Sequence, residues 1–262
     1  MDDIFLLETK ALQIVDRGTV FDAATAPPDA RFCTFTSLEV PSDGRLLVGC
    51  RRARTKDSSD EDVLILMSED GGAVWNTVFD GFGTYQIDGG AGRFRNALLT
   101  EVSPGCLMVH LCWIDHSDSS LPMANPQTQG LLPAKLFVGN STDGGRTWYN
   151  LQEVLLLPHR GNVSTGELLV LQNGTLALPY ETFKEYYDTT TGKHRAALRF
   201  SSDGGKTWTG PTIVAHDDQG QRILYWDQRL AVHPGDGRLI AMIWTHDRHS
   251  GQDLEMHVTR GS

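Results

Sequence analysis

Positive charge and long apolar runs are both scarce in this chain of 262 residues, which has 23 Lys and Arg against 33 Asp and Glu and a net charge of -10. A nucleic-acid-binding protein needs a basic surface for the phosphates, so we expect no nucleic-acid partner. No apolar run reaches the roughly 20 residues that span a bilayer, so we expect no membrane span. The acidic start, MDDIFLLETK, shows no secretion signal, which leaves the compartment open and favours the cytoplasm.

Cysteine is scarce too, and its spacing fits neither a metal site nor a disulfide framework. The four positions are Cys33, Cys50, Cys106 and Cys112, which we expect to be reduced, partly buried thiols. The histidines and aspartate at 246–249 have no known ligand spacing, and no glycine-rich segment has the strand–turn–helix context of a phosphate loop. The sequence therefore predicts no metal and no cofactor.

What the chain does contain is an eight-residue phrase that occurs three times. It reads SEDGGAVW at 68–75, STDGGRTW at 141–148 and SSDGGKTW at 201–208, so all three fit Ser-x-Asp-x-Gly-x-x-Trp. A carboxylate that accepts backbone N–H groups, followed by glycines at positive φ, forms a tight turn. We expect the tryptophan to be largely buried against the next sheet. Repetition at this period predicts a stack of similar supersecondary units.

Each phrase follows stretches with the alternating pattern of β-strands. The innermost strand of each unit is expected within 35–40, 94–102, 167–171 and 226–232. Four strands in up-and-down order form a propeller blade. The chain ends at Ser262, where the fourth phrase is expected. We therefore expect three complete blades and three strands of a fourth, in a single domain over residues 1–262.

The phrase is the Asp box, and the chain resembles the sialidase (neuraminidase) superfamily over nearly its whole length. The phrases NGTLALPY (173–180) and YWDQRLAV (225–232) resemble a bacterial sialidase-like subgroup. The resemblance implies an all-β, six-bladed β-propeller, here truncated to about four blades. It also implies a retaining exo-glycosidase that removes a terminal sialic acid or a related acidic sugar without a cofactor. The boxes themselves are expected to stabilise hairpins, because they occur in catalytic and non-catalytic propellers alike.

The resemblance also indicates catalytic candidates. The loop 52–57, RARTKD, resembles the sialidase loop that carries the acid/base aspartate, so Asp57 is the candidate, with Asp60 and Asp62 as competitors. The family nucleophile is a tyrosine activated by a glutamate; Glu167 is the candidate glutamate and Glu181 the alternative. The tyrosine and one arginine are expected in the missing blades, so the chain alone is expected to be inactive.

Arginines are the expected ligands of the substrate carboxylate, because a guanidinium binds a carboxylate through two parallel hydrogen bonds. The candidates are Arg31, Arg52 and Arg95; Arg51 and Arg52 are alternatives to Arg31 as carboxylate binders. Arg31 lacks the proline of the family's Arg-Ile-Pro phrase and falls about two residues early. Further substrate-binding candidates, on the innermost strand of the fourth unit, are Asp227 and Arg229. The expected partner is a glycan or a small acidic sugar.

Other functions fit the same pattern. A non-catalytic Asp-box propeller would bind carbohydrate or protein, and its inner charges would form only a structural ion-pair network. An enzyme with the same blades could act on neutral or uronic-acid sugars, and it would lack the arginine cluster. An acid, at least two arginines and a Tyr/Glu pair in one pocket would favour the sialidase-type enzyme.

Overall fold

The described chain consists almost wholly of β-strands and their connecting turns. The computed structural model describes residue 14 and residues 16–157, 161–164, 166–192, 194–217 and 222–261. The helical element within these residues is η1 (Pro28–Ala30), a single 3-10 turn that precedes the first strand. No helix in this part of the chain is long and apolar enough to cross a membrane.

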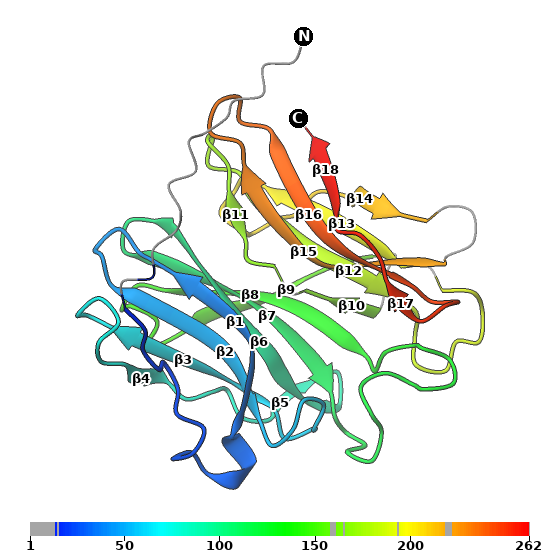
Figure 1. The fold of residues 1–262 in the computed structure, drawn as a ribbon, viewed down its shortest axis with the longest axis horizontal. Coiled ribbons are helices and arrows are strands. Elements are labelled where there is room, and N and C mark those ends of the chain that lie inside the picture. The colour runs from blue at the N-terminus through cyan, green and yellow to red at the C-terminus, as the bar shows by residue number, and fades with distance from the viewer. Residues whose placement is uncertain are drawn as a thin grey trace.

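The strands follow one another in antiparallel units (Figure 1). The first unit is β1 (Phe32–Glu39), β2 (Leu46–Ala53), β3 (Asp62–Ser68) and β4 (Asn76–Phe79), paired in that order. The second is β6 (Gly90–Ser103), β7 (Cys106–Asp115), β8 (Ala134–Ser141) and β9 (Tyr149–Val154), with the short β5 (Tyr85–Ile87) beside β6. Each unit is an up-and-down blade of the propeller type.

The third and fourth units have shorter or fewer strands. The third contains β12 (Leu176–Phe183), β13 (Arg195–Ser201) and β14 (Thr212–His216), and its inner strand is divided into β10 (Gly161–Val163) and β11 (Leu169–Val170). The fourth contains β15 (Ile223–Val232), β16 (Leu239–Asp247), β17 (Gln252–Asp253) and β18 (His257–Gly261). In Figure 1 the first two units lie on one side and the last two on the other, with β1, β6 and β15 toward the centre of the view.

The hydrophobic core lies between neighbouring blades. Side chains of the first blade meet those of the second in a buried cluster that includes Leu47, Ile65, Leu99 and Val109. A second cluster joins the second blade to the third, and a smaller one joins β13 to β16. β3 is buried along its whole length, which is why its sequence, DVLILMS, is an almost continuous apolar run.

The three Asp boxes lie on equivalent hairpins, β3–β4, β8–β9 and β13–β14. In the second box the Asp143 carboxylate accepts hydrogen bonds from the Ser141 hydroxyl (2.8 Å), from the Thr147 hydroxyl (2.6 Å) and from the N–H groups of Arg146 and Thr147 (both 3.0 Å). The Ser141 hydroxyl accepts from the N–H of Gly145 (2.9 Å), and Gly145 has a φ of 82°. The serine and the aspartate thus satisfy the backbone donors of a turn that needs glycine.

The box tryptophans differ from expectation in two ways. Trp75, Trp148 and Trp208 are half-buried rather than largely buried. Trp148 also packs on the cluster that its blade shares with the preceding blade, and Trp208 does the same one blade further on. The expectation of burial against the next sheet is therefore corrected: the second and third boxes close their hairpins against the blade before them, whereas Trp75 packs on residues of its own blade.

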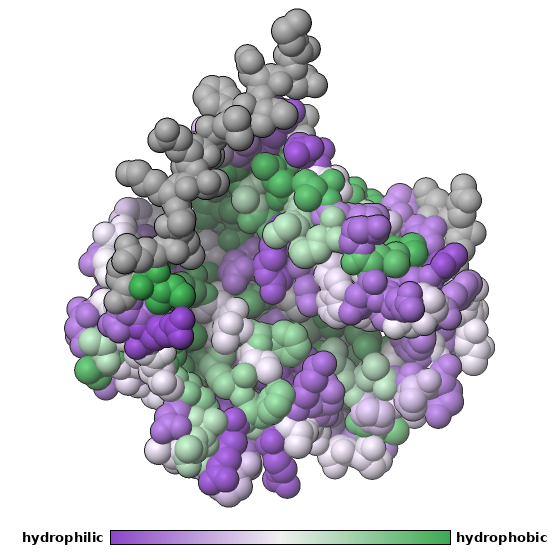
Figure 2. Space-filling view, in the orientation of Figure 1, coloured by the Kyte–Doolittle hydropathy of each residue, from purple (hydrophilic) through white to green (hydrophobic). Residues whose placement is uncertain are grey.

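Hydrophobic side chains also reach the surface on the last blade. Figure 2 shows apolar surface gathered near β16 and β18, where Met242, Met256 and Val258 are exposed. Among the described strands β18 pairs only with β16, so it forms an edge of its sheet. An apolar strand edge favours association with other chains.

We expect Asp143→Ala to lower the free energy of unfolding by about 1–2 kcal/mol at pH 7, because the turn loses its acceptor. Partial burial opposes ionisation, but the hydrogen bonds from Thr147, Ser141 and Arg146 outweigh it and lower the pKa of Asp143 to about 2. Since the unfolded-state pKa is near 3.9, this stabilisation is present above about pH 4 and is lost as the pH falls toward 2. Urea unfolding of both proteins between pH 7 and pH 2.5 measures the difference.

The matched control is Glu69→Ala, which removes an exposed carboxylate from the first box hairpin. It should change stability by less than about 0.5 kcal/mol. If the difference in the free energy of unfolding between wild type and Asp143→Ala stays constant down to pH 2.5, this account of the box is contradicted.

Candidate functional site

The innermost strands are interrupted at equivalent places. β1 has a register shift at 35–36, β6 at 95–96 and β15 at 227–228, and in the third blade the strand breaks between β10 and β11. Phe35 and Asp227, the first residues of their bulges, both have a φ of 51°. Bulges re-aim side chains and are common beside active sites. Side chains from different blades can therefore converge at these interruptions and form a site.

The interruptions contact one another from blade to blade. The guanidinium carbon of Arg95 lies 5.0 Å from the centre of the Phe35 ring, a cation–π contact between the first two blades. The Asn96 amide donates a hydrogen bond to the backbone oxygen of Ser164 in the third blade. A Cβ on Gly166 would lie 2.8 Å from the backbone oxygen of Gln228, so only glycine fits against the fourth blade. The four interruptions are thus linked from blade to blade along one inner surface.

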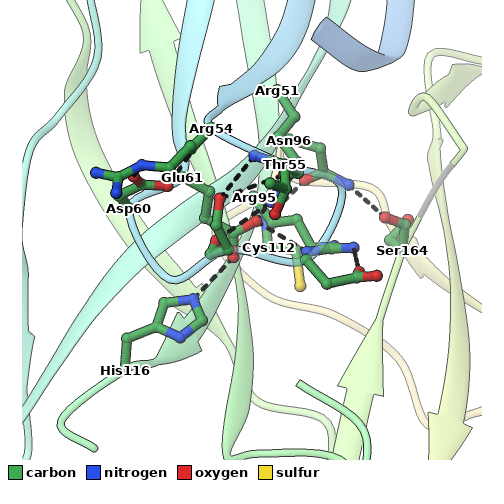
Figure 3. Close-up of polar contacts among 12 residues, drawn as sticks. Arg51, Arg54, Thr55, Asp60, Glu61, Arg95, Asn96, Cys112, His116 and Ser164 are labelled. Carbon is green, nitrogen blue, oxygen red and sulfur yellow. Dashed lines mark hydrogen bonds and ion pairs between the residues drawn. The ribbon is translucent and has the colours of Figure 1, made fainter. Parts of the chain in front are cut away.

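Five side chains from the first two blades gather on this surface, and we call them the mouth cluster (Figure 3 shows four of them labelled). They are Arg51, Asp57, Glu61, Arg95 and His116. Arg95 donates to Glu61 Oε2 (2.8 Å) and to Asp57 Oδ1 (3.2 Å) through its two terminal nitrogens. The Arg95 side chain is only 10% exposed, so these two carboxyl groups hold it in one orientation.

Glu61 is the centre of the mouth cluster. Its side chain is fully buried, and it accepts hydrogen bonds from Arg51 and Arg95. Nε2 of His116, just beyond β7, lies 2.9 Å from Glu61 Oε1. Burial alone would favour the neutral acid, but His116 and the two guanidinium groups outweigh it and hold the pKa of Glu61 below its usual range. The buried site therefore contains an ionised carboxylate that is paired on both oxygens.

Arg51 fixes the loop that carries Asp57. Besides Glu61, its guanidinium donates to the backbone oxygens of Thr55 (3.1 Å) and Ser58 (3.3 Å), on either side of Asp57. Because the Arg51 side chain is fully buried, it has no free edge for a ligand. Arg51, which was weighed as a carboxylate binder, instead positions the loop.

Asp57 faces both Arg95 and solvent. Its side chain is 57% exposed and lines a cavity of about 420 Å³. The cavity is lined by Arg54, residues 57–60 and residues 119–122, and so lies between loops of the first two blades. The carboxyl group is thus anchored by one cation and open on its other side, as a proton donor to a bound ligand must be.

The two competing aspartates have other roles. Asp60 pairs with Arg54 (3.0 Å) at the rim of the same cavity. Asp62 is buried, and it accepts hydrogen bonds from the N–H groups of Phe82 (3.1 Å) and Gly83 (2.8 Å). Asp62 therefore anchors the segment before β5 and does not join the mouth cluster.

Across the surface, Glu181 on β12 is the buried acid of the third blade. Burial and the charge of Asp227 raise its pKa to about 8, although the N–H of Gln228 donates to its Oε1 (3.2 Å). Its neighbour on β10 is Val163, next to the Ser164 that binds Asn96. The thiol of Cys112, whose pKa burial raises to about 12, lies within the electrostatic influence of Arg95, Glu61 and Glu181. Glu181 and the mouth cluster therefore both act on Cys112 through their charges.

Glu167, the sequence candidate, lies among other acids. It is partly buried, and its charge acts on Glu39, which accepts a hydrogen bond from the N–H of Glu101 (3.1 Å). Burial first, and then these neighbouring charges, raise the pKa of Glu39. The structure therefore groups Glu167 with Glu39, away from the contacts of Asp57 and Arg95.

The remaining substrate-binding candidates are spread out. Arg31 is exposed and donates to the backbone oxygen of Ala26 (2.9 Å) in its own turn. Arg52 pairs with Asp80 on the face of β2 opposite Arg51. Arg229 is exposed and donates to the backbone oxygen of Gln228 (3.3 Å). Asp227 and Arg229 act on Glu181 through their charges, so they belong to its surroundings.

The fourth blade contains one tyrosine, Tyr225. The ring of Tyr225 lies 5.6 Å from the ring of His257 on β18 and packs in the small cluster between the last two blades. Its position does not suit a nucleophile beside Asp57. In the described residues, no group of three or more His, Cys, Asp or Glu is arranged to hold a metal ion.

Comparisons with known proteins give the fold. No family model matches the chain, and no curated protein matches it in sequence. Among solved structures, a Hadza microbial sialidase matches with a TM-score of 0.62 at 17% identity, over 89% of this chain and 45% of that one. The intramolecular trans-sialidase from Ruminococcus gnavus, in complex with oseltamivir carboxylate, matches at 0.61 and 12% identity, over 91% and 73%. The GH93 α-L-arabinofuranosidase of Fusarium graminearum matches at 0.58 and 17%, over 86% and 61%.

These neighbours confirm the predicted all-β propeller fold of the sialidase type. The chain spans less than half of the microbial sialidase and 61% of the arabinofuranosidase. The total of six blades therefore stays a prediction.

We expect Glu61→Gln to lower the free energy of unfolding by roughly 3–5 kcal/mol, because it leaves the buried guanidinium of Arg51 without a counter-charge and leaves Arg95 with Asp57 alone. The adjacent Asp60→Asn removes only a surface ion pair and should change stability by about 0–1 kcal/mol. Urea unfolding at pH 7 compares the two variants. Equal effects would show that Glu61 is not the centre of the mouth cluster.

Proposed function

We propose that this chain carries the proton-donor side of a glycoside hydrolase site of sialidase type, which removes a terminal sialic acid or a related acidic sugar with retention. The observation that carries the proposal is the ion pair between Asp57 and Arg95, whose nearest oxygen and nitrogen atoms lie 3.2 Å apart. Asp57 lines a cavity, and Arg95 stands on the bulge of the innermost strand β6. The sialidase-type fold supports it, since the fold neighbours include a sialidase and a trans-sialidase.

In this proposal Asp57 is the general acid and base. It protonates the glycosidic oxygen as the bond breaks and later takes a proton from the attacking water. Arg51 and Glu61 position it, because Arg51 binds the backbone on both sides of Asp57 and Glu61 fixes Arg51 and Arg95. Arg95 is the substrate-binding arginine of the cluster. The carboxylate of the sugar binds Arg95 in the place of Asp57. This exchange leaves Asp57 free to turn toward the leaving group.

Glu181 is the second carboxyl group in this proposal, in place of Glu167. A buried acid with a strongly raised pKa beside a charged cluster is typical of functional sites. It would accept the proton of the tyrosine nucleophile that the family resemblance implies. The other candidates from the sequence have smaller roles in this proposal. The charges of Asp227 and Arg229 shift the pKa of Glu181, and Arg31 and Arg52 bind partners elsewhere.

A neutral sugar is the second candidate substrate, and the charge of the mouth cluster favours it. Two guanidinium groups face two carboxyl groups, so no arginine of the cluster is left over for an anion. A fold neighbour is an α-L-arabinofuranosidase, crystallised with arabinobiose. Methylumbelliferyl sialoside, glucuronide and arabinofuranoside, tested in parallel, separate these possibilities. Cleavage of the sialoside supports the proposal, and cleavage of the arabinofuranoside alone overturns its substrate.

We expect Asp57→Ala to lower kcat/KM on natural glycosides by roughly 10²–10⁴-fold, the usual worth of general acid–base catalysis. The loss should be much smaller on nitrophenyl glycosides, whose leaving group needs little protonation. The measurement uses the longest form of the protein that its gene encodes. Asp60→Ala is the control and should keep most of the rate; an Asp57→Ala protein with full activity would remove the assignment.

We expect the rate to rise with pH toward about 8 if Glu181 acts as a base, because its pKa of about 8 keeps it protonated below that pH. Glu181→Gln should abolish activity or remove this rise, whereas Glu167→Gln should leave the pH profile unchanged. Profiles of kcat/KM from pH 5 to pH 9 test both variants. A changed profile in Glu167→Gln alone would restore the original candidate.

A further inference from the structure

The sulfur atoms of Cys33 on β1 and Cys50 on β2 lie 2.7 Å apart. Both cysteines are free thiols, and Cys50 is buried while Cys33 is partly exposed. A disulfide bond is about 2.05 Å long, so the sulfurs need to move by well under 1 Å to bond. Among the described residues, no other two cysteines have their sulfur atoms in contact.

The pair lies across the bulge of β1. Thr34 is paired with Arg51 and Ser37 with Gly49, so Cys50 is the single residue of β2 opposite the two bulge residues, Phe35 and Thr36. A bulge breaks the regular strand pairing and leaves a weak point in the ladder. A covalent bond from Cys50 to Cys33 would close this weak point at the bulge that holds Phe35, whose ring contacts Arg95.

The surroundings favour reaction at Cys33. Its side chain packs against the small buried cluster of Cys50, Leu64 and Leu66 and stays partly exposed. The Cys50 thiol first, and the charge of Arg52 further, lower the pKa of Cys33 against the effect of burial. The thiolate is the nucleophile in disulfide exchange, and a lowered pKa increases its share. The neighbouring Cys33 sulfur first, and burial second, raise the pKa of Cys50, so Cys50 is suited to react second.

We propose that Cys33 and Cys50 are a redox-active pair, which small-molecule disulfides convert reversibly into an intramolecular disulfide across the β1 bulge. The Cys33 thiolate attacks one sulfur of the reagent and expels one thiol. Cys50 then attacks the Cys33 sulfur and expels the second thiol, so two protein thiols are oxidised to a disulfide and one reagent disulfide is reduced to two thiols. The bond fastens β1 to β2 and fixes Phe35 under Arg95. This inference does not depend on the proposed glycosidase activity.

The test incubates the folded protein with oxidised glutathione and then alkylates it under denaturing conditions. We expect the free thiols to fall from four to two, with a loss of two hydrogen atoms in the intact mass and a non-reduced peptide that links Cys33 to Cys50. Dithiothreitol should restore all four thiols. Retention of four thiols, or glutathione that stays bound to Cys33, would overturn the proposal.

Matched variants make the result specific. Cys50→Ser should stop at a mixed disulfide between glutathione and Cys33, and Cys106→Ser should still form the intramolecular bond. Because the bond closes a loop with a sequence separation of 17, the oxidised wild type should melt about 5 °C above the reduced form. An oxidised protein with an unchanged melting temperature would contradict the claim that the bond fastens the bulge.

Discussion

The buried carboxylate of Glu61 is the interaction on which the candidate site depends. A fully buried charge is costly unless every oxygen is paired, and Glu61 has Arg51 and Arg95 on one oxygen and His116 on the other. These partners come from β2, from the bulge of β6 and from the end of β7, so one carboxylate ties two blades together at a single point. Because Arg51 also holds the backbone on both sides of Asp57, the position of the exposed acid follows from that of the buried one.

Along the strands, the residues that stabilise the blades and the residues that form the candidate site lie at different levels. At one end of the second and third blades the Asp box satisfies its own turn with Ser, Asp and Gly, and packs its tryptophan on the preceding blade. At the level of the bulges the innermost strands give up regular pairing and exchange contacts between blades instead, as in the bond from Asn96 to Ser164. Regular ladders would place alternate side chains on fixed faces, whereas bulges allow Arg95 and Asp227 to leave that pattern. The irregular level is therefore where polar groups can converge.

The sequence predicted those features of the fold that depend on neighbouring residues in the chain. Asp-Gly-Gly turns and alternating strands are local signals, and they located the Asp-box hairpins and three of the four innermost strands. Asp57 and Arg95 were both candidates, and their contact follows from the blade order. Glu61 was missed because it stands in an acidic run, DSSDED, in which no spacing distinguishes the buried acid from its exposed neighbours. The break between β10 and β11 could not be anticipated from the sequence, because it depends on contacts with the fourth blade; Glu167 therefore stays a prediction from the sequence, and Glu181 is the alternative that the fold favours.

Strand alternation explains why three consecutive residues of β2 have three different roles. Arg51 points to the mouth cluster, so Cys50 and Arg52 must point to the opposite face. On that face Arg52 reaches Asp80 and also acts on the Cys33 thiol, which Cys50 contacts directly. The sequence Cys-Arg-Arg contains no information on which arginine is buried until the register with β1 and β3 is known. Once it is known, a single strand connects the loop of the candidate acid on one face to a pair of thiols on the other.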